Sequence, residues 1–377
     1  MRDYFITGAS GAIGSALVPI LLSDASNRVS LLLRARSPTE LNERLDSLCS
    51  FWQIDARDAA LRGRLKGLRG DVTLAAFGLA QEDYRELCAS TSHIVHSAGN
   101  VRMNLPIEQA RLSAVSAAQN ILALAHAARR LEKIEFVSTV GVGGRTHGEL
   151  PEEWLSGRRV FHNTYEQAKA EAEDVVRLEV DHGMPLTVHR PSMVVGDSTS
   201  GRIIHFQVFY HLCEFLSGRR TLGLSPDFGH ARLDIVPADY VARCIAWSST
   251  TTATSGKILH ACSGPTSALL LAPLRERVRQ TFASAGRRVP PLITLPASAF
   301  SALVRALAIF LPSDAKRAIR TLPVFLEYLA TDQSFANRQT LALTSSAGLA
   351  LPSPECYLDR VLGYYLEQSA KKNSLSS

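Results

Sequence analysis

The stretch Tyr4-Phe-Ile-Thr-Gly8-Ala-Ser-Gly11-Ala-Ile-Gly14 decides the fold, because a short apolar run leads directly into three evenly spaced glycines. Residues Tyr4–Ile6 predict a buried strand, and the apolar stretch Ser15–Leu22 predicts a helix. A glycine turn between a parallel strand and a helix lets the backbone approach a pyrophosphate. The N–H groups and positive dipole of the helix N-terminus can then bind it. In this context the spacing predicts a dinucleotide site, the alternative being a tight turn without a ligand.

The second predicted strand, Arg28–Arg34, ends in the basic tripeptide Arg34-Ala-Arg36. In a doubly wound fold this strand end faces the adenosine ribose. An acidic residue there binds the 2′-hydroxyl of NAD, whereas an arginine favours a 2′-phosphate. Two arginines without a carboxylate therefore predict NADP(H), with Arg34 and Arg36 among its contacts. A solvated basic loop is the alternative.

Strand and helix patterns alternate through the next hundred residues. Residues 38–66 have a charged helical pattern, followed by a helix around Gln81–Cys88 and a strand over Ser92–His96. A helix from about Glu108 to Arg130 and a strand over Lys133–Val137 come next. Such alternation predicts an α/β fold, a doubly wound parallel sheet covered by helices on both faces.

Ligands of such sheets bind at the carboxyl ends of the strands. Small or polar residues follow several of the predicted strands and leave room for a cofactor that crosses the sheet edge. The residues predicted to contact the cofactor there are Thr7, Gly8, Ser10, Gly11, Ala12, Ile13, Gly14, Asp71, Val72, Ser97, Ala98 and Gly99.

A candidate catalytic group combines a hydroxyl after the strand Lys133–Val137 with a tyrosine and a lysine one helical turn apart. Thr139 follows the strand, and Tyr165-Glu-Gln-Ala-Lys169 opens a helical stretch that runs to about Val180. Residues four apart share a helix face, so Tyr165 and Lys169 can address one ligand. The ammonium of Lys169 is expected to lower the pKa of Tyr165 and make it a usable acid or base. The threonine hydroxyl can hydrogen-bond the reacting oxygen.

The chain resembles the extended short-chain dehydrogenase/reductase superfamily over roughly residues 1–262. The catalytic triad of that superfamily is matched by Thr139, Tyr165 and Lys169. The closer likeness is to thioester reductase domains and fatty acyl reductases. It rests on Arg190-Pro-Ser-Met-Val-Val-Gly-Asp-Ser-Thr-Ser-Gly201 and on Leu233-Asp-Ile-Val-Pro-Ala-Asp-Tyr-Val241. The resemblance implies a Rossmann-type NADP-binding domain over residues 1–262. It adds to the cofactor contacts Tyr165, Lys169, Pro191, Ser192 and Val194.

One segment departs from the superfamily pattern. Many extended members carry an asparagine in the helix that here precedes the strand Lys133–Val137. It stands in an Asn-Val-x-Gly-Thr pattern. The aligned stretch here reads Ala114-Val-Ser-Ala-Ala118. A proton relay through that asparagine is therefore not available, and a water or backbone carbonyl would have to replace it.

The resemblance implies an NADPH-dependent reductase of an acyl thioester, linked to CoA or to a separate carrier protein. The product is an aldehyde, and a second hydride would give an alcohol; the sequence leaves open whether that second step occurs. In this scheme Tyr165 protonates the developing oxyanion, Thr139 holds it, and Lys169 binds the nicotinamide ribose. Two alternatives remain open. One is a dehydrogenase or epimerase/dehydratase of a steroid-like alcohol or sugar nucleotide; the other is a non-catalytic dinucleotide sensor.

Beyond residue 262 the sheet pattern gives way to helices, which predicts a smaller, mainly helical substrate lobe over residues 263–377. Helices are expected over Ala272–Ser284, Ser298–Leu311, Asp314–Tyr328 and Pro354–Leu366, and the polar tail 371–377 is expected to be disordered. Residues 196–233 of the first domain are expected to contribute to the substrate pocket.

Six residues are predicted to contact substrate, namely Asn100, Val101, Met193, Phe206, Phe209 and Tyr210. The last three belong to an aromatic-rich run that has two interpretations. It is either the wall of an acyl pocket or a helix that packs against the main domain, and one helix can do both.

Composition excludes other classes of protein. The formal charge of +6 is spread along 377 residues without a lysine-rich tract, so nucleic-acid binding is not expected. His205 and His211 lack a third ligand at suitable spacing, so no metal site is expected. The six scattered cysteines are typical of a reducing compartment. No signal peptide or membrane contact is expected, and the predicted location is cytoplasmic.

Overall fold

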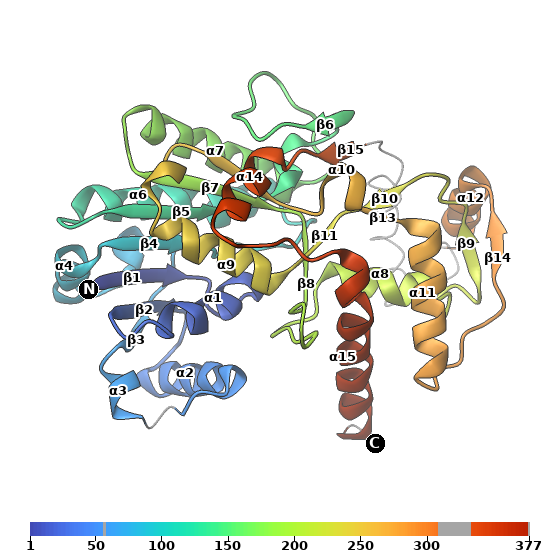
Figure 1. Cartoon of the computed structure of the whole chain (residues 1–377), viewed down its shortest axis with the longest axis horizontal. Coiled ribbons are helices and arrows are strands. Elements are labelled where there is room, and N and C mark those ends of the chain that lie inside the picture. The colour runs from blue at the N-terminus through green and yellow to red at the C-terminus, as the bar shows by residue number, and fades with distance from the viewer. Residues whose placement is uncertain (56–57, 308–332, 376–377) are drawn as a thin grey trace.

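A seven-stranded parallel sheet forms the centre of the protein (Figure 1), in the strand order β12-β7-β5-β4-β1-β2-β3. The structure is a computed structural model that describes residues 1–55, 58–307 and 333–375. The strands of this sheet are β1 (Arg2–Thr7), β2 (Asn27–Leu33), β3 (Leu65–Arg69), β4 (His93–His96), β5 (Lys133–Val137), β7 (Leu186–Pro191) and β12 (Ile258–Ala261). The chain order reverses between β1 and β4, which confirms the doubly wound fold and places its ligand crevice at their carboxyl ends.

Helices cover both faces of the sheet, each over its own hydrophobic cluster. One face carries α1 (Ala12–Leu22), α2 (Pro38–Trp52) and α9 (Ala238–Ser249). The other carries α4 (Gln81–Ser90), α5 (Ile107–Arg111), α6 (Ala117–Ala127) and α7 (Thr164–Asp181). A π-helical turn, η2 (Leu112–Ser116), joins α5 to α6. The short helices are α3 (Ala59–Arg62), η1 (Ala75–Gly78), η3 (Val140–Gly143), η4 (Thr252–Thr254) and α10 (Gly264–Ser267).

The helical pattern predicted over residues 38–66 is confirmed for α2 and for the short α3 but is wrong where α2 ends and where β3 begins. Gln53 takes a left-handed conformation, with φ of 60°, and ends α2. The chain then forms the third strand of the sheet, β3, in which buried Leu65 and Leu68 are flanked by exposed Lys66 and Arg69. Charged residues are common on edge strands. Because the segment before this strand is charged as well, the pattern predicted helix for both.

Several elements beyond β7 build a smaller lobe at the carboxyl edge of the sheet (Figure 1). Short strand pairs support it: β8 (Met193–Val195) with β11 (Ile235–Pro237), β9 (Leu224–Pro226) with β14 (Ile293–Leu295), and β10 (Arg232–Leu233) with β13 (Leu269–Leu270). Its helices are α8 (Val208–Leu216), α11 (Leu271–Ser284), α12 (Ala297–Leu307) and α15 (Pro354–Leu375). The chain also returns to the main domain: β15 (Gln333–Phe335) pairs with β6 (Gly148–Leu150), and α14 (Arg338–Ser346) packs against β12.

The structure confirms the predicted helices as α11, α12 and α15 within the residues that it describes, whereas the helix predicted over Asp314–Tyr328 lies outside them. The tail predicted to be disordered is wrong for residues 371–375, because α15 continues to Leu375. An ion pair between Lys371 and Glu367, four residues apart, favours this extension. Residues 376–377 lie outside the described part. None of the described helices has the length and apolarity needed to cross a membrane.

Candidate active site

The glycine turn after β1 has the shape of a dinucleotide cradle. Gly8 has a φ of +82°, and a Cβ there would lie 2.5 Å from the Ala98 nitrogen. A Cβ on Gly14 would clash with the Gly8 carbonyl oxygen. Gly11 is the N-cap of α1. Because glycine has no side chain, the cap makes no side-chain hydrogen bond to the first N–H groups of the helix. The turn therefore fits a pyrophosphate that binds to backbone N–H groups.

The loop after β4 is fixed to this cradle by the last residue of β1. The Ser97 N–H and hydroxyl donate to the Thr7 carbonyl at 3.1 and 2.9 Å, and Ala98 N–H donates to the Thr7 hydroxyl at 3.4 Å. The same hydroxyl contacts His96 Nδ1 at 2.8 Å. The structure thus brings the predicted residues Thr7, Gly8, Ser97 and Ala98 together at the edge of the sheet.

Arg34 and Arg36 follow β2 and are both exposed. Arg36 pairs with Glu40 at 3.7 Å, while no ion pair of Arg34 is found among the described residues. After β3, the Asp71 carboxylate accepts hydrogen bonds from the N–H and hydroxyl of Thr73, and the Val72 carbonyl accepts one from Asn120. Because Arg36 already pairs with Glu40, Arg34 is better placed than Arg36 to bind a further anion.

The three predicted catalytic residues converge at the end of β5. Thr139 begins the η3 turn, and its hydroxyl accepts the Gly141 N–H at 3.1 Å. Tyr165 lies in the first turn of α7, whose N-cap, Asn163, accepts the Glu166 N–H at 3.0 Å. One turn later, Lys169 Nζ donates to the Val137 carbonyl at 2.8 Å. The cap and this hydrogen bond fix the tyrosine and the lysine against the strand that leads to Thr139.

Burial sets the charge states of this group. It raises the pKa of Tyr165 to about 12, with a further rise from Glu166, and a hydrogen bond with Thr139 opposes it. A lowered pKa is expected from the spacing of Tyr165 and Lys169, but the desolvation of the buried phenol raises it instead. Burial also lowers the pKa of Lys169 to about 8, against the attraction of Glu173. At neutral pH the tyrosine is thus a proton donor and the lysine a cation.

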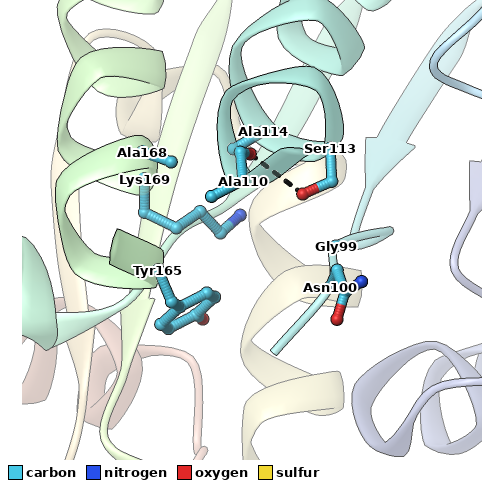
Figure 2. A pocket seen from close by; sticks show the side chains of 8 residues that line it. All are labelled: Gly99, Asn100, Ala110, Ser113, Ala114, Tyr165, Ala168 and Lys169. Carbon is cyan, nitrogen blue, oxygen red and sulfur yellow. Dashed lines mark hydrogen bonds between the residues drawn. The ribbon is translucent and has the colours of Figure 1, made fainter. Parts of the chain in front are cut away.

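A small cavity of about 10 Å³ adjoins these residues. Figure 2 shows the Lys169 side chain pointing between the Gly99–Asn100 loop and the η2 region, with the Tyr165 ring beside it. Gly99, Asn100, Ala110, Ser113, Ala114, Tyr165, Ala168 and Lys169 line it. The Ser113 hydroxyl donates to the Ala110 carbonyl at 2.9 Å. The volume suits about one water molecule.

Sequence reasoning missed Ala110 and Ser113 as lining residues of this cavity. The available signal was the segment Ala114–Ala118, in which small residues replace the usual asparagine. Ala114 lines the cavity, and the widened π turn around it is a distortion that often occurs at functional sites.

The predicted substrate residues fall into two groups. Asn100 lines the cavity and Val101 beside it is 52% exposed, whereas Phe209 and Tyr210 have no exposed surface. Tyr210 accepts the Gly196 N–H at 3.0 Å and packs against Phe206. Phe209 and Tyr210 therefore pack in the core in this structure, which favours the packing interpretation for those two.

The remaining predicted contacts lie just past β7. Pro191 ends that strand, Ser192 donates its N–H to the Ala261 carbonyl at 3.1 Å, and Met193 and Val194 belong to β8. Met193 is partly buried beside the core of the lobe. Among the described residues no cluster of histidine, cysteine or carboxylate side chains has the geometry of a metal site.

Comparison with known proteins agrees with this geometry. The profile of an NAD-binding family described as "Male sterility protein" matches residues 6–245. The isonitrile lipopeptide synthase of Streptomyces coeruleorubidus is 28% identical over 242 residues, which cover 64% of this chain but only 16% of that protein. The L-2-aminoadipate reductase of Schizosaccharomyces pombe is 26% identical over 264 residues, covering 66% and 18%. This chain therefore spans only a small part of the length of these relatives.

Two solved structures share the fold. The terminal R domain from the myxalamid PKS-NRPS biosynthetic pathway gives a TM-score of 0.81 at 24% identity, covering 98% of this chain and 91% of that one. A thiolation-reductase di-domain from an archaeal non-ribosomal peptide synthetase gives a TM-score of 0.77 at 17% identity, covering 98% and 76%. The chain belongs to the NAD-binding male sterility protein family.

Proposed function

We propose that this protein uses NADPH to reduce an acyl thioester, releasing a thiol and an aldehyde. The observation that carries the proposal is the convergence of Thr139, Tyr165 and Lys169 at the end of β5, one loop away from the glycine cradle. The relatives give the substrate class its support, since the similar chains include part of a lipopeptide synthase and a thiolation-reductase di-domain.

The hydroxyl of Thr139 accepts a hydrogen bond from Gly141 N–H, so its own proton is free to point toward Tyr165 or toward a substrate oxygen. Tyr165, with a pKa of about 12, carries a proton at neutral pH. Two hydroxyl donors beside the same position can stabilise negative charge on a carbonyl oxygen. Such stabilisation in a site closed to water is the main catalytic effect that we assign to this chain.

When bound, the nicotinamide supplies a hydride to the thioester carbon. Tyr165 gives its proton to the carbonyl oxygen, which converts the thioester into a hemithioacetal. The hydroxyl of the hemithioacetal then returns its proton to the Tyr165 phenolate as the C–S bond breaks, which leaves the aldehyde, and the departing thiolate takes a proton from water to become the thiol. Lys169, positively charged below a pKa of about 8, holds the nicotinamide ribose and favours the phenolate that Tyr165 becomes.

We assign the 2′-phosphate of NADPH to Arg34 and Arg36, which are exposed at the end of β2. The lobe built on residues 196–233, 263–307 and 354–375 is the part to which we assign the acyl chain. A carrier protein as donor of the thioester is the finer form of the proposal, with CoA as the alternative carrier.

The test is NADPH oxidation with acyl-CoA esters and with the same acyl groups on a phosphopantetheinylated carrier protein, followed by identification of the product. The Tyr165→Phe variant is expected to lose at least about a hundredfold in turnover, because it lacks the donated proton. Tyr84→Phe in α4, outside the site, is the matched control and is expected to keep full activity. Turnover of ketones or secondary alcohols, with none of any thioester, would overturn the substrate class.

A further inference from the structure

Behind Lys169 lies a buried ion pair that the proposed chemistry does not use. Glu173 follows Lys169 by one turn of α7, and Arg190 is in β7. Arg190 Nε and Nη2 bind the two carboxylate oxygens of Glu173 at 3.0 and 2.6 Å. The Arg190 and Glu173 side chains are 0% and 3% exposed. Because Tyr165, Lys169 and Glu173 are each four residues apart, they lie along one face of the helix.

The remaining contacts of Arg190 fix its guanidinium from other elements. Nη1 donates to the Glu153 carbonyl at 3.0 Å and contacts His260 Nε2 at 3.3 Å. Burial lowers the pKa of His260 to about 3, with a smaller contribution from Arg190, so this histidine is neutral. Nε2 then accepts from Arg190, and Nδ1–H donates to the Ala336 carbonyl at 2.7 Å. The Glu173 carboxylate is therefore held in one position from β7, β12 and the returning C-terminal segment.

A buried ion pair by itself is weak evidence for a role in stability, because desolvation offsets much of its attraction. Its position next to the catalytic ammonium has a clearer consequence. Glu173 is the group that raises the pKa of Lys169 against the effect of burial. The other titratable groups facing Lys169 are His96, which burial keeps neutral, and Tyr165, which is protonated at neutral pH. Near Glu173 itself lie Arg190 and Asp174.

We propose that Glu173 and Arg190 are positioning residues of Lys169: the charge of Glu173 keeps Lys169 protonated at working pH, and Arg190 holds that carboxylate in place while sharing part of its charge. Arg190 also precedes Pro191 and Ser192, so the same side chain joins the catalytic helix to the strand end predicted to border the cofactor. The inference rests on the proposed role of Lys169 in holding the nicotinamide ribose.

The test measures NADPH affinity as a function of pH by cofactor fluorescence, without any substrate. Wild type should bind tightly while Lys169 is charged and lose affinity as the pH rises through about 8. Glu173→Gln removes the nearby negative charge, so its midpoint should fall by about one pH unit or more. In Arg190→Gln the Glu173 carboxylate no longer shares its charge with a guanidinium and acts more strongly on Lys169, so the midpoint should rise. Opposite shifts separate an electrostatic role from general damage to the fold, which would lower affinity in both variants without moving the midpoint.

The controls isolate the group that titrates. Lys169→Met should bind weakly at every pH and show no midpoint. Glu171→Gln removes another carboxylate of α7, one that pairs bidentately with Arg111 on the partly exposed side, and should keep the wild-type midpoint. If Arg190→Gln does not fold, the double variant Glu173→Gln/Arg190→Gln buries no lone charge and should show the lowered midpoint of Glu173→Gln.

A wild-type midpoint in folded Glu173→Gln, or in the double variant, would overturn the proposal. Shifts in the same direction in both single variants would also overturn it. Because the readout is cofactor binding, these results stand whether or not any thioester is reduced. A failure of the thioester assay with intact pH-dependent binding would contradict the proposed function alone.

Discussion

Lys169 Nζ donates a hydrogen bond to the carbonyl oxygen of Val137 at 2.8 Å, which joins the middle of α7 to the last residue of β5. Thr139 follows Val137 by two residues, so the same contact sets the spacing between the two sides of the triad. The ammonium has three N–H donors, and this bond uses one of them. In the proposed function the other two remain for the nicotinamide ribose and for the small cavity at the π turn, which Lys169 lines.

Thr139→Val keeps the shape of the side chain but removes the hydroxyl that accepts the Gly141 N–H and faces Tyr165. We expect turnover to fall by about 10²–10³-fold, the typical effect of removing one donor to a developing oxyanion. NADPH affinity should change little, since the hydroxyl acts on the substrate oxygen. Single-turnover kinetics measure the effect, and Thr139→Ser is the control that restores the donor. Equal rates for the valine variant and wild type would rule out this role for the threonine.

Gly14→Ala should abolish cofactor binding, because the added Cβ would clash with the Gly8 carbonyl and open the turn. The matched control is Gly363→Ala in α15, also a helical glycine, where an added Cβ meets no atom within 4 Å. That control should keep cofactor affinity and gain about 0.5–1 kcal/mol in unfolding free energy from the better helix former. Titration with NADPH and urea denaturation of both variants check the pair. An alanine at 14 that binds NADPH normally would contradict the cradle.

The strongest parts of the sequence prediction were those with local causes. The glycine turn and the Tyr165–Lys169 spacing depend on residues a few positions apart, and the structure has both where the pattern indicated. The third strand was missed because Lys66 and Arg69 are exposed on an edge strand and, with the charged segment before them, fit the pattern of a charged helix. The raised pKa of Tyr165 and the Glu173–Arg190 pair depend on burial between distant segments, which local patterns do not report.

The aromatic run over residues 203–212 also depends on contacts between distant segments, which the sequence pattern does not report. Phe209 and Tyr210 fit both a pocket wall and a packed helix at the level of sequence. What separates the two interpretations is the contact of Tyr210 with Tyr365 of α15, about 150 positions away along the chain. The Tyr365 ring lies 5.2 Å from that of Tyr210 and 4.9 Å from that of Phe206, and Phe209 packs on Tyr210. Only the folded chain brings that tyrosine into place.

Arg34→Asp should weaken NADPH binding far more than NADH binding, because the new carboxylate repels a 2′-phosphate and can accept a hydrogen bond from a 2′-hydroxyl. Loss of one charge-assisted hydrogen bond corresponds to a drop of about tenfold to a hundredfold in NADPH affinity. Dissociation constants for both cofactors, in wild type and variant, give the ratio. Arg28→Asp, at an exposed position in β2, is the control for the loss of charge. Equal losses for the two cofactors would sink the assignment of the 2′-phosphate to Arg34.

Acid should destabilise the fold through His96. Burial, and next the charge of Lys169, lower the pKa of this histidine to about 3, below the value of about 6.5 in an unfolded chain. The folded state therefore binds fewer protons, so the stabilisation is fully present above about pH 6.5 and is lost as the pH falls toward 3. Lowering the pH from about 7 to about 5 should reduce the free energy of unfolding by about 2 kcal/mol through this histidine.

The measurement is urea denaturation of wild type and of His96→Asn at the two pH values. The asparagine amide can keep a polar contact with the Thr7 hydroxyl, which now meets His96 Nδ1 at 2.8 Å, but it does not titrate. His96→Asn should therefore lose about 2 kcal/mol less than wild type on acidification. His93 and His260, whose pKa values burial also lowers, to about 4 and about 3, keep part of the acid sensitivity in the variant. His147→Asn, at an exposed loop position, should leave the wild-type pH dependence in place. A pH dependence in His96→Asn equal to that of wild type would mean that His96 takes up its proton without unfolding the chain.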